Sequence, residues 1–169
     1  MIRFATIEDA NDIASVHISS WRSAYKGLMP DDVLRGLNIE SRTKSWRKIL
    51  SGDATVTIVA EMSDIIVGFS NFGRSREPES AISEGEILAI YLVESHWSKG
   101  IGGKLLARSL EELRNQGYKS AMLWVLESNT RAIEFYSKYG FVSDGNIKIE
   151  ERPYMILREQ RMIKNTLIT

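Results

Sequence analysis

Three glycines and two lysines gather in one short segment, Ser98-Lys99-Gly100-Ile101-Gly102-Gly103-Lys104, at the start of an amphipathic helical pattern. At the N-terminus of a helix, the first amide N–H groups have no intrahelical acceptor and the helix dipole is positive, so a phosphate can bind there. Glycines would let a phosphate approach the backbone, and Lys99 and Lys104 would add positive charge. The segment is therefore either a phosphate cradle or a tight strand-to-helix turn with solvated lysines.

Two other kinds of phosphate cradle fit this segment poorly. A P-loop needs Gly-x-x-x-x-Gly-Lys-Ser/Thr, but Leu105 follows the Gly-Lys pair and Ser98 occupies the first glycine position. A dinucleotide fold needs Gly-x-Gly-x-x-Gly after its first strand, but Leu105 stands where the third glycine belongs. The sequence therefore disfavours a nucleoside triphosphatase and a dinucleotide-binding enzyme.

The glycine segment belongs to a longer set of motifs. The strand-like run Glu86-Ile87-Leu88-Ala89-Ile90-Tyr91-Leu92 leads to Trp97-Ser98-Lys99-Gly100-Ile101-Gly102, and further along comes Asn129-Thr130-Arg131-Ala132-Ile133-Glu134-Phe135-Tyr136-Ser137-Lys138-Tyr139-Gly140-Phe141. This set resembles the GNAT N-acetyltransferase superfamily, whose patterns are Arg/Gln-x-x-Gly-x-Gly/Ala and Asn-x-x-Ala-x-x-Phe-Tyr-x-x-x-Gly-Phe. Trp97 stands where the superfamily has Arg or Gln, which leaves backbone amides as the main expected ligands of a pyrophosphate.

The resemblance implies acetyl-coenzyme A as the cosubstrate and no metal. It implies a gap between two parallel strands, where backbone groups of Ile90, Tyr91 and Leu92 meet the pantetheine and acetyl portions. The pyrophosphate would be held by Lys99, Gly100, Ile101, Gly102, Gly103 and Lys104. Asn129 would hydrogen-bond the pantetheine arm, and because asparagine is also a preferred helix N-cap, both roles stay open.

Two side chains are candidates for the chemistry itself. Acetyl transfer needs a neutral amine, whereas a free alkyl amine is mostly protonated near neutral pH. Glu86 is the candidate general base, directly or through water; alternatively its carboxylate only attracts a cationic substrate. The resemblance makes Tyr136 the candidate acid that protonates the departing thiolate; alternatively it packs beside Phe135.

Aromatic side chains follow one line of the first predicted helix. His17, Trp21 and Tyr25 occur at positions i, i+4 and i+8, which lie on one face. Trp21 and Tyr25 are candidates for a rim that binds a cationic amine. Aromatic residues at helical spacing also serve packing in the core, so that interpretation stays beside the first.

The elements that must position these residues are predicted from hydrophobic period and from turn residues. Thr6 and Asp9 form a variant of the capping box at the first helix. Helices are expected at about 6–26, 31–37, 39–50, 100–116 and 129–139, and strands at 1–5, 54–62, 65–72, 84–93, 120–126, 141–149 and 152–157, with a last turn near Glu150. The resemblance implies an α+β, sandwich-like fold with a mixed central sheet of about six to seven strands and about four helices.

Composition bounds the remaining alternatives. The chain has 169 residues, expected to form one domain over 1–169, and its 22 lysines and arginines balance its 22 aspartates and glutamates. A nucleic-acid partner is disfavoured because there is no overall basic charge, and no segment is apolar enough to span a membrane. With no cysteine and two isolated histidines, a thiolate or histidine metal site is not expected, and the working assumption is a cytoplasmic protein.

The expected function is an acyltransferase that moves an acetyl group from acetyl-coenzyme A to a primary amine of a small molecule or peptide by direct attack on the thioester. One alternative is a catalytically silent acetyl-coenzyme A binding or sensing module. Another is acetylation of protein lysines, which would need an open groove. A homodimer through the last strands, including Tyr154 and Met155, is a further hypothesis.

Overall fold

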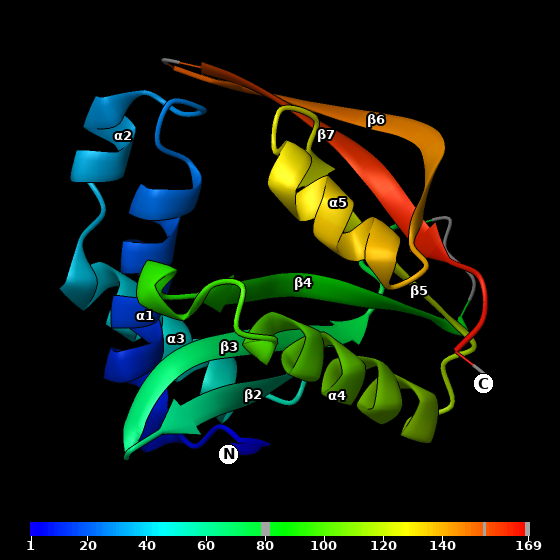
Figure 1. Ribbon diagram of the computed structural model, residues 1–169, viewed down its shortest axis with the longest axis horizontal. Coiled ribbons are helices and arrows are strands. Elements are labelled where there is room, and N and C mark those ends of the chain that lie inside the picture. The colour runs from blue at the N-terminus through cyan, green and yellow to red at the C-terminus, as the bar shows by residue number, and fades with distance from the viewer. Residues whose placement is uncertain (79–81, 154, 168–169) are drawn as a thin grey trace.

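Seven strands form one mixed sheet in the order β1-β2-β3-β4-β5-β7-β6 (Figure 1). The computed structural model describes residues 1–78, 82–153 and 155–167. The strands are β1 (Ile2–Phe4), β2 (Thr55–Met62), β3 (Ile65–Arg74), β4 (Glu84–Leu92), β5 (Ser120–Leu126), β6 (Val142–Arg152) and β7 (Met155–Lys164). Neighbours pair antiparallel except β4 and β5, which are parallel. The predicted α+β fold with a mixed sheet is confirmed.

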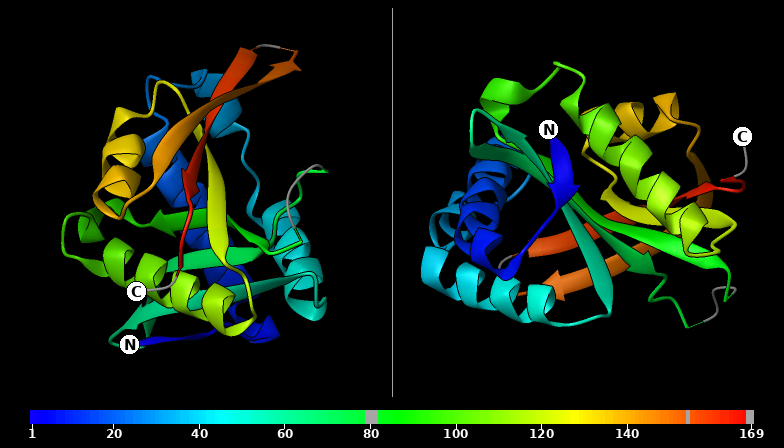
Figure 2. Two further views of the ribbon diagram at one scale, coloured as in Figure 1. Left: turned by 90° about the vertical axis from the view of Figure 1, so that its right-hand side faces the viewer. Right: turned by 90° about the horizontal axis from the view of Figure 1, so that it is seen from below.

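Helices cover both faces of this sheet (Figure 2). The described α-helices are α1 (Ala10–Ala24), α2 (Asp31–Arg35), α3 (Ile39–Ser51), α4 (Ile101–Asn115) and α5 (Thr130–Lys138). They fall in the five ranges predicted from the sequence pattern, whereas the resemblance implied about four. One core packs α1 and α3 against the sheet around Ile13, Trp46 and Phe69. The other core packs α4 against the opposite face around Leu105 and Leu113. Each apolar helix stripe is therefore buried against its own face of the sheet.

Two local sequence signals produce the expected backbone. The capping box forms, since the Thr6 amide donates to Asp9 Oδ2 at 2.8 Å. The β2–β3 hairpin turns at Ser63 and Asp64, whose φ angles of 48° and 61° are both positive, as a tight two-residue hairpin requires. Both features depend on neighbours in the chain, which explains why they could be predicted.

The turn of the last hairpin was predicted wrongly. The sequence pattern placed it near Glu150, but β6 continues to Arg152 and β7 begins at Met155. Glu150 pairs with Leu157 across the ladder, so this part of the chain is strand rather than turn. Pro153 follows the last residue of β6, and a proline has no N–H for the ladder, which favours the end of the strand there.

The β6–β7 hairpin reaches toward α2 and the segment after α1 (Figure 1). Met29 and Leu34 from that side pack with Leu126 of β5 and Leu157 of β7 in a third buried apolar cluster. Met155 is half-buried and packs on this cluster, whereas Tyr154, named in the dimer hypothesis, lies outside the described residues. In the described part of the chain, no helix is long and apolar enough to cross a membrane.

The two parallel strands at the centre of the sheet separate along their length. Among the described residues, β4 and β5 pair at Glu84–Ser120, Gly85–Ala121 and Glu86–Met122 and no further. Beyond this point β4 follows β3, with Leu88 forming a bulge, while β5 follows β7 to Leu126. The gap between the C-terminal halves of β4 and β5 opens the middle of the molecule.

Candidate active site

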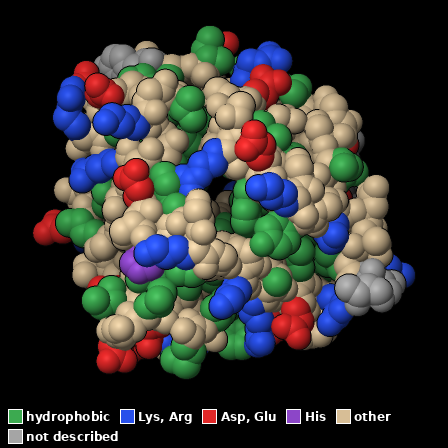
Figure 3. All heavy atoms as spheres, viewed as in Figure 1, with side chains coloured by type: hydrophobic (Ala, Val, Ile, Leu, Met, Phe, Trp, Pro, Cys, Tyr) green, Lys and Arg blue, Asp and Glu red, His purple; other side chains and the backbone are tan. Residues whose placement is uncertain are grey.

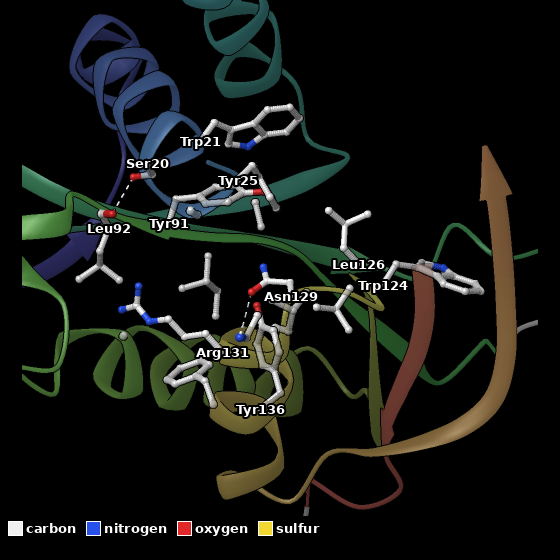
Figure 4. A pocket seen from close by; sticks show the side chains of 18 of the residues that line it. Ser20, Trp21, Tyr25, Tyr91, Leu92, Trp124, Leu126, Asn129, Arg131 and Tyr136 are labelled. Carbon is white, nitrogen blue, oxygen red and sulfur yellow. Dashed lines mark hydrogen bonds between the residues drawn. The ribbon is translucent and has the colours of Figure 1, made fainter. Parts of the chain in front are cut away.

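A cleft of about 910 Å³ occupies the gap between β4 and β5. The space-filling view shows an opening near the centre of the same face (Figure 3). In the close-up, Trp21, Tyr25 and Tyr91 lie on one side of the cleft and Asn129, Arg131 and Tyr136 on the other (Figure 4). Ile90, Tyr91 and Leu92 line the cleft on the part of β4 that has left β5, as the resemblance implied.

The glycine segment forms one end of the cleft. Gly100 is the N-cap of α4 with a φ of 78°, in the left-handed region that glycine adopts at little cost. No described side chain caps this helix, and Gly100, Gly102 and Gly103 at its start line the cleft. A Cβ on Gly103 would lie 1.8 Å from the Tyr139 hydroxyl, so this glycine leaves room for the side chain of the residue that ends α5. The backbone thus offers the anion cradle that a pyrophosphate needs.

The two lysines of the segment are directed elsewhere. A separate hollow of about 230 Å³ lies beside the end of β2 and is lined by Lys99, Ile101 and Lys104. The main cleft is lined by Ser98, Gly100, Gly102 and Gly103. Arg131 is one of the basic residues that line the cleft, together with Lys138, and its guanidinium carbon lies 3.5 Å from the centre of the Trp97 ring. Arg131 stands inside the Asn129–Phe141 motif, yet its sequence context did not single it out.

Asn129 and Tyr136 come from the two ends of α5. The Asn129 side chain caps the helix, accepting a hydrogen bond from the Ala132 amide at 3.2 Å, and the residue also lines the cleft. The ring of Tyr136 packs edge-on against Phe135 and Phe141, while the residue is half-buried and lines the cleft. Burial raises the pKa of Tyr136, with a smaller contribution from Tyr91, so its hydroxyl stays protonated.

Glu86 is buried in an ion pair at the base of the cleft. Its carboxylate receives Arg76 Nη2 at 2.8 Å on Oε1, and Arg76 Nε at 3.2 Å and the Arg76 amide at 3.0 Å on Oε2. The glutamate side chain is 2% exposed, whereas the arginine side chain is 64% exposed. The forked arginine pairing orients the carboxylate and brings a second charge into the cleft that the sequence pattern did not reveal.

The aromatic line of α1 forms the opposite wall. The Tyr25 and Tyr91 hydroxyls are 3.1 Å apart, and Trp21 packs edge-on against Tyr25. Burial raises the pKa of Tyr91, while its contacts with Tyr25 and Trp21 act in the opposite direction. Trp21 Nε1 is buried, and among the described residues no acceptor is in hydrogen-bonding geometry with it. Ser20 ties this wall to the end of β4 through a 2.7 Å hydrogen bond to the Leu92 carbonyl (Figure 4).

His17 supports the wall from behind. It stacks on Tyr91 with ring centroids 5.1 Å apart, and its Nδ1 accepts a 3.1 Å hydrogen bond from Trp46 Nε1. Burial lowers the pKa of His17 to about 3, with a smaller contribution from Arg42, so the imidazole is neutral in the folded protein. Trp21 and Tyr25 thus line the cleft and also pack on the apolar cluster of Met29 and Leu34, whereas His17 belongs to the core. Binding of a cationic amine by Trp21 and Tyr25 remains a prediction.

The buried neutral His17 makes folding depend on pH. The unfolded chain binds a proton at this histidine below about pH 6.5 and the folded chain does not, so stability falls as the pH drops from about 6.5 toward 3. We expect a contribution of up to about 1.4 kcal/mol per pH unit to this loss. The free energy of unfolding, measured with denaturant at several pH values in this range, should depend less steeply on pH in His17→Gln than in wild type. His96→Gln is the control, and an unchanged slope in His17→Gln would contradict the buried neutral state.

The separated parallel strands, the amide cradle at α4 and the polar side chains along the gap together define an acyl-coenzyme A-dependent transferase. The acetyltransferase (GNAT) family model matches residues 18–141, and the chain belongs to this family. It is an acetyl-coenzyme A-dependent N-acetyltransferase, as its motifs predicted.

Similar proteins agree with this assignment. The chain is 36% identical over 151 residues to YuaI, an uncharacterized N-acetyltransferase of Bacillus subtilis (strain 168), covering 88% of this chain and 84% of that protein. It is 26% identical over 161 residues to the spermidine N(1)-acetyltransferase of Thermoplasma acidophilum, covering 90% and 96%. The fold matches the PaiA N-acetyltransferase of Thermoplasma acidophilum in complex with coenzyme A with a TM-score of 0.76 at 20% identity, covering 98% of each chain.

Proposed function

We propose that the chain acetylates a primary amine of a small molecule or peptide, by direct attack of the amine on the thioester. The observation that carries this proposal is the position of the cleft, which has the amide cradle at one end, Tyr136 on one side, and Glu86 at its base. Acetyl-coenzyme A brings the activated acyl group, and the chain's own residues supply orientation and proton transfer. The cytoplasmic location and the dimer remain predictions.

Tyr136 acts as the acid. Because burial raises its pKa, the phenol carries its proton throughout the neutral range and can donate it to a thiolate that leaves beside it. The ring is held by Phe135 and Phe141, which limits its rotation and keeps the hydroxyl directed to the cleft. Asn129 at the other end of the helix orients the pantetheine arm with the donors that its N-cap bond leaves unused.

Glu86 acts as the base that takes the proton from the amine, through water. The carboxylate is oriented by Arg76, whose Nη2 lies 2.8 Å from Oε1. Both oxygens already accept hydrogen bonds from Arg76, yet each carboxylate oxygen can accept more than one. The alternative for Glu86, electrostatic attraction of a cationic amine, is weakened because the adjacent guanidinium offsets its charge.

The acceptor half of the cleft is the part lined by Arg76, Glu86, Lys148, Glu150, Arg152 and Glu159. Its acidic and basic side chains are equal in number and paired: Arg76 with Glu86 at 2.8 Å, Lys148 with Glu159 at 3.6 Å, and Arg152 with Glu150 at 3.0 Å. A polycation would need an excess of carboxylates. A balanced site suits an amine that carries its own carboxylate, such as an α-amino acid.

Arg76 is the side chain that could recognise such a carboxylate. Its Nε and Nη2 donate to Glu86, and among the described residues no acceptor is paired with Nη1. The remaining N–H groups of the exposed guanidinium edge are therefore available for a substrate anion. The aromatic wall of Trp21 and Tyr25 would then face the body of the acceptor.

A panel of matched acceptors tests this choice of substrate class. In a thiol-release assay with saturating acetyl-coenzyme A, we expect kcat/KM for at least one α-amino acid to exceed that for its carboxamide by about 10-fold, because the neutral amide cannot form an ion pair with Arg76. Spermidine should be a poorer acceptor than the amino acid. Preferred acetylation of spermidine, or equal rates for acid and amide, would contradict the carboxylate site and leave the acetyltransferase assignment intact.

A further inference from the structure

We propose that Arg131, held flat against the indole of Trp97, supplies the side-chain contact to the pyrophosphate of acetyl-coenzyme A that the superfamily pattern otherwise places at position 97. The two residues come from different elements, since Trp97 precedes the glycine segment and Arg131 lies in the first turn of α5. The inference rests on acetyl-coenzyme A as the donor and concerns how this particular chain holds it.

The geometry is that of a planar cation on an aromatic face. The Arg131 guanidinium carbon lies 3.5 Å from the centre of the Trp97 ring, which is close stacking. The indole is itself held in place, because Trp97 Nε1 donates a 2.9 Å hydrogen bond to the Leu92 carbonyl at the end of β4. Trp97 is therefore uncharged, but its indole determines where the Arg131 guanidinium lies.

Stacking leaves the guanidinium free to bind an anion. A guanidinium uses its face against a ring and keeps its N–H donors in the plane, directed outward. In the described part of the chain, no residue accepts a hydrogen bond from the Arg131 side chain; Glu94 acts on it only at a distance. Two parallel N–H groups match two phosphate oxygens, which a lysine ammonium cannot do as well.

The neighbouring charges point to the same assignment. Lys99 and Lys104, which the sequence made the natural phosphate partners, line the hollow beside β2 instead. Arg131 and Trp97 both line the main cleft together with Gly100 and Gly102. The anion cradle of α4 and the stacked arginine thus act on one ligand from two sides, the first through backbone amides and the second through a charged side chain.

Calorimetry with three probes tests the proposal without needing an acceptor: coenzyme A, 3′-dephospho-coenzyme A, and pantetheine at millimolar concentration. Arg131→Ala should weaken coenzyme A and the dephospho form by about 10-fold each, the loss of a charge-assisted contact, and leave pantetheine unchanged. Trp97→Leu should lower the affinity for the same two probes by a smaller factor. Arg131→Ala should lower these affinities less in the Trp97→Leu background than in wild type, because the two side chains act as a unit. Arg131→Met, which keeps the aliphatic stem, should behave like Arg131→Ala.

The matched control is Arg108→Ala, because Arg108 also lies over an aromatic ring, that of Phe4, but on α4 outside the cleft. If Arg131→Ala lowered the affinity for pantetheine equally, Arg131 would have a packing role. If it lowered the affinity for coenzyme A but not for the dephospho form, Arg131 would contact the 3′-phosphate instead of the pyrophosphate. An undiminished affinity in Arg131→Ala and Arg131→Met, or a loss confined to Lys99→Ala and Lys104→Ala, would also overturn the proposal. Absent turnover with normal binding would instead count against the proposed acceptor chemistry.

Discussion

Tyr136→Phe should lower kcat by about 100-fold while changing the dissociation constant of acetyl-coenzyme A by less than about twofold. The substitution removes one hydroxyl and keeps the ring that packs against Phe135 and Phe141. If the hydroxyl donates a proton to the leaving thiolate, its loss raises the barrier of that step without removing a contact that binds the donor. Steady-state kinetics together with calorimetry separate the two quantities.

The pKa of Tyr136 adds a second signature. Burial raises it, so the phenol does not lose its proton as the pH rises through the neutral and mildly alkaline range. The basic limb of the wild-type pH profile should therefore not come from this residue below about pH 10. Tyr118→Phe is the control, since Tyr118 packs on the same core outside the cleft. Turnover in Tyr136→Phe equal to that of the control would remove Tyr136 from the mechanism.

Glu86→Gln is the second change with a large expected effect. We expect kcat/KM for the acceptor to fall by about 100-fold, because an amide cannot take up the proton of the amine. The fold should lose only about 1–2 kcal/mol, since the released Arg76 is 64% exposed and is hydrated by solvent. Kinetics over a range of pH, with thermal unfolding measured in parallel, would record both.

Glu84→Gln is the matched control for this substitution. Glu84 lies two residues earlier on β4, so it shares a face of the strand with Glu86, but it does not line the cleft. A rise in KM for the acceptor with kcat unchanged in Glu86→Gln would assign the carboxylate to substrate attraction. An unchanged kcat/KM in Glu86→Gln would place the base elsewhere, and Glu159, which lines the cleft with a 23% exposed side chain, would be the next candidate.

Much of the fold could be predicted because the signals are local. The capping box of Thr6 and Asp9, the two-residue turn at Ser63 and Asp64, and the strand at 120–126 depend on side chains and dihedral angles within a few residues. The last hairpin is the exception. Its turn was misplaced because the apolar alternation of Ile147 and Ile149 ends at Glu151, although β6 continues past that residue.

The family, the glycine segment at the start of α4 and the order of the elements could be predicted from the sequence, because these depend on residues close together in the chain. The same motifs placed Tyr136, Glu86 and Asn129 on elements that line the cleft. Which charged side chains meet in the cleft depends on the tertiary structure. Arg76 pairs with Glu86, Arg131 stacks on Trp97, and Lys104 lines the hollow beside β2 instead of the cleft. Each of these contacts joins segments that are far apart in the chain, and the periodicity within one segment does not encode a contact with another.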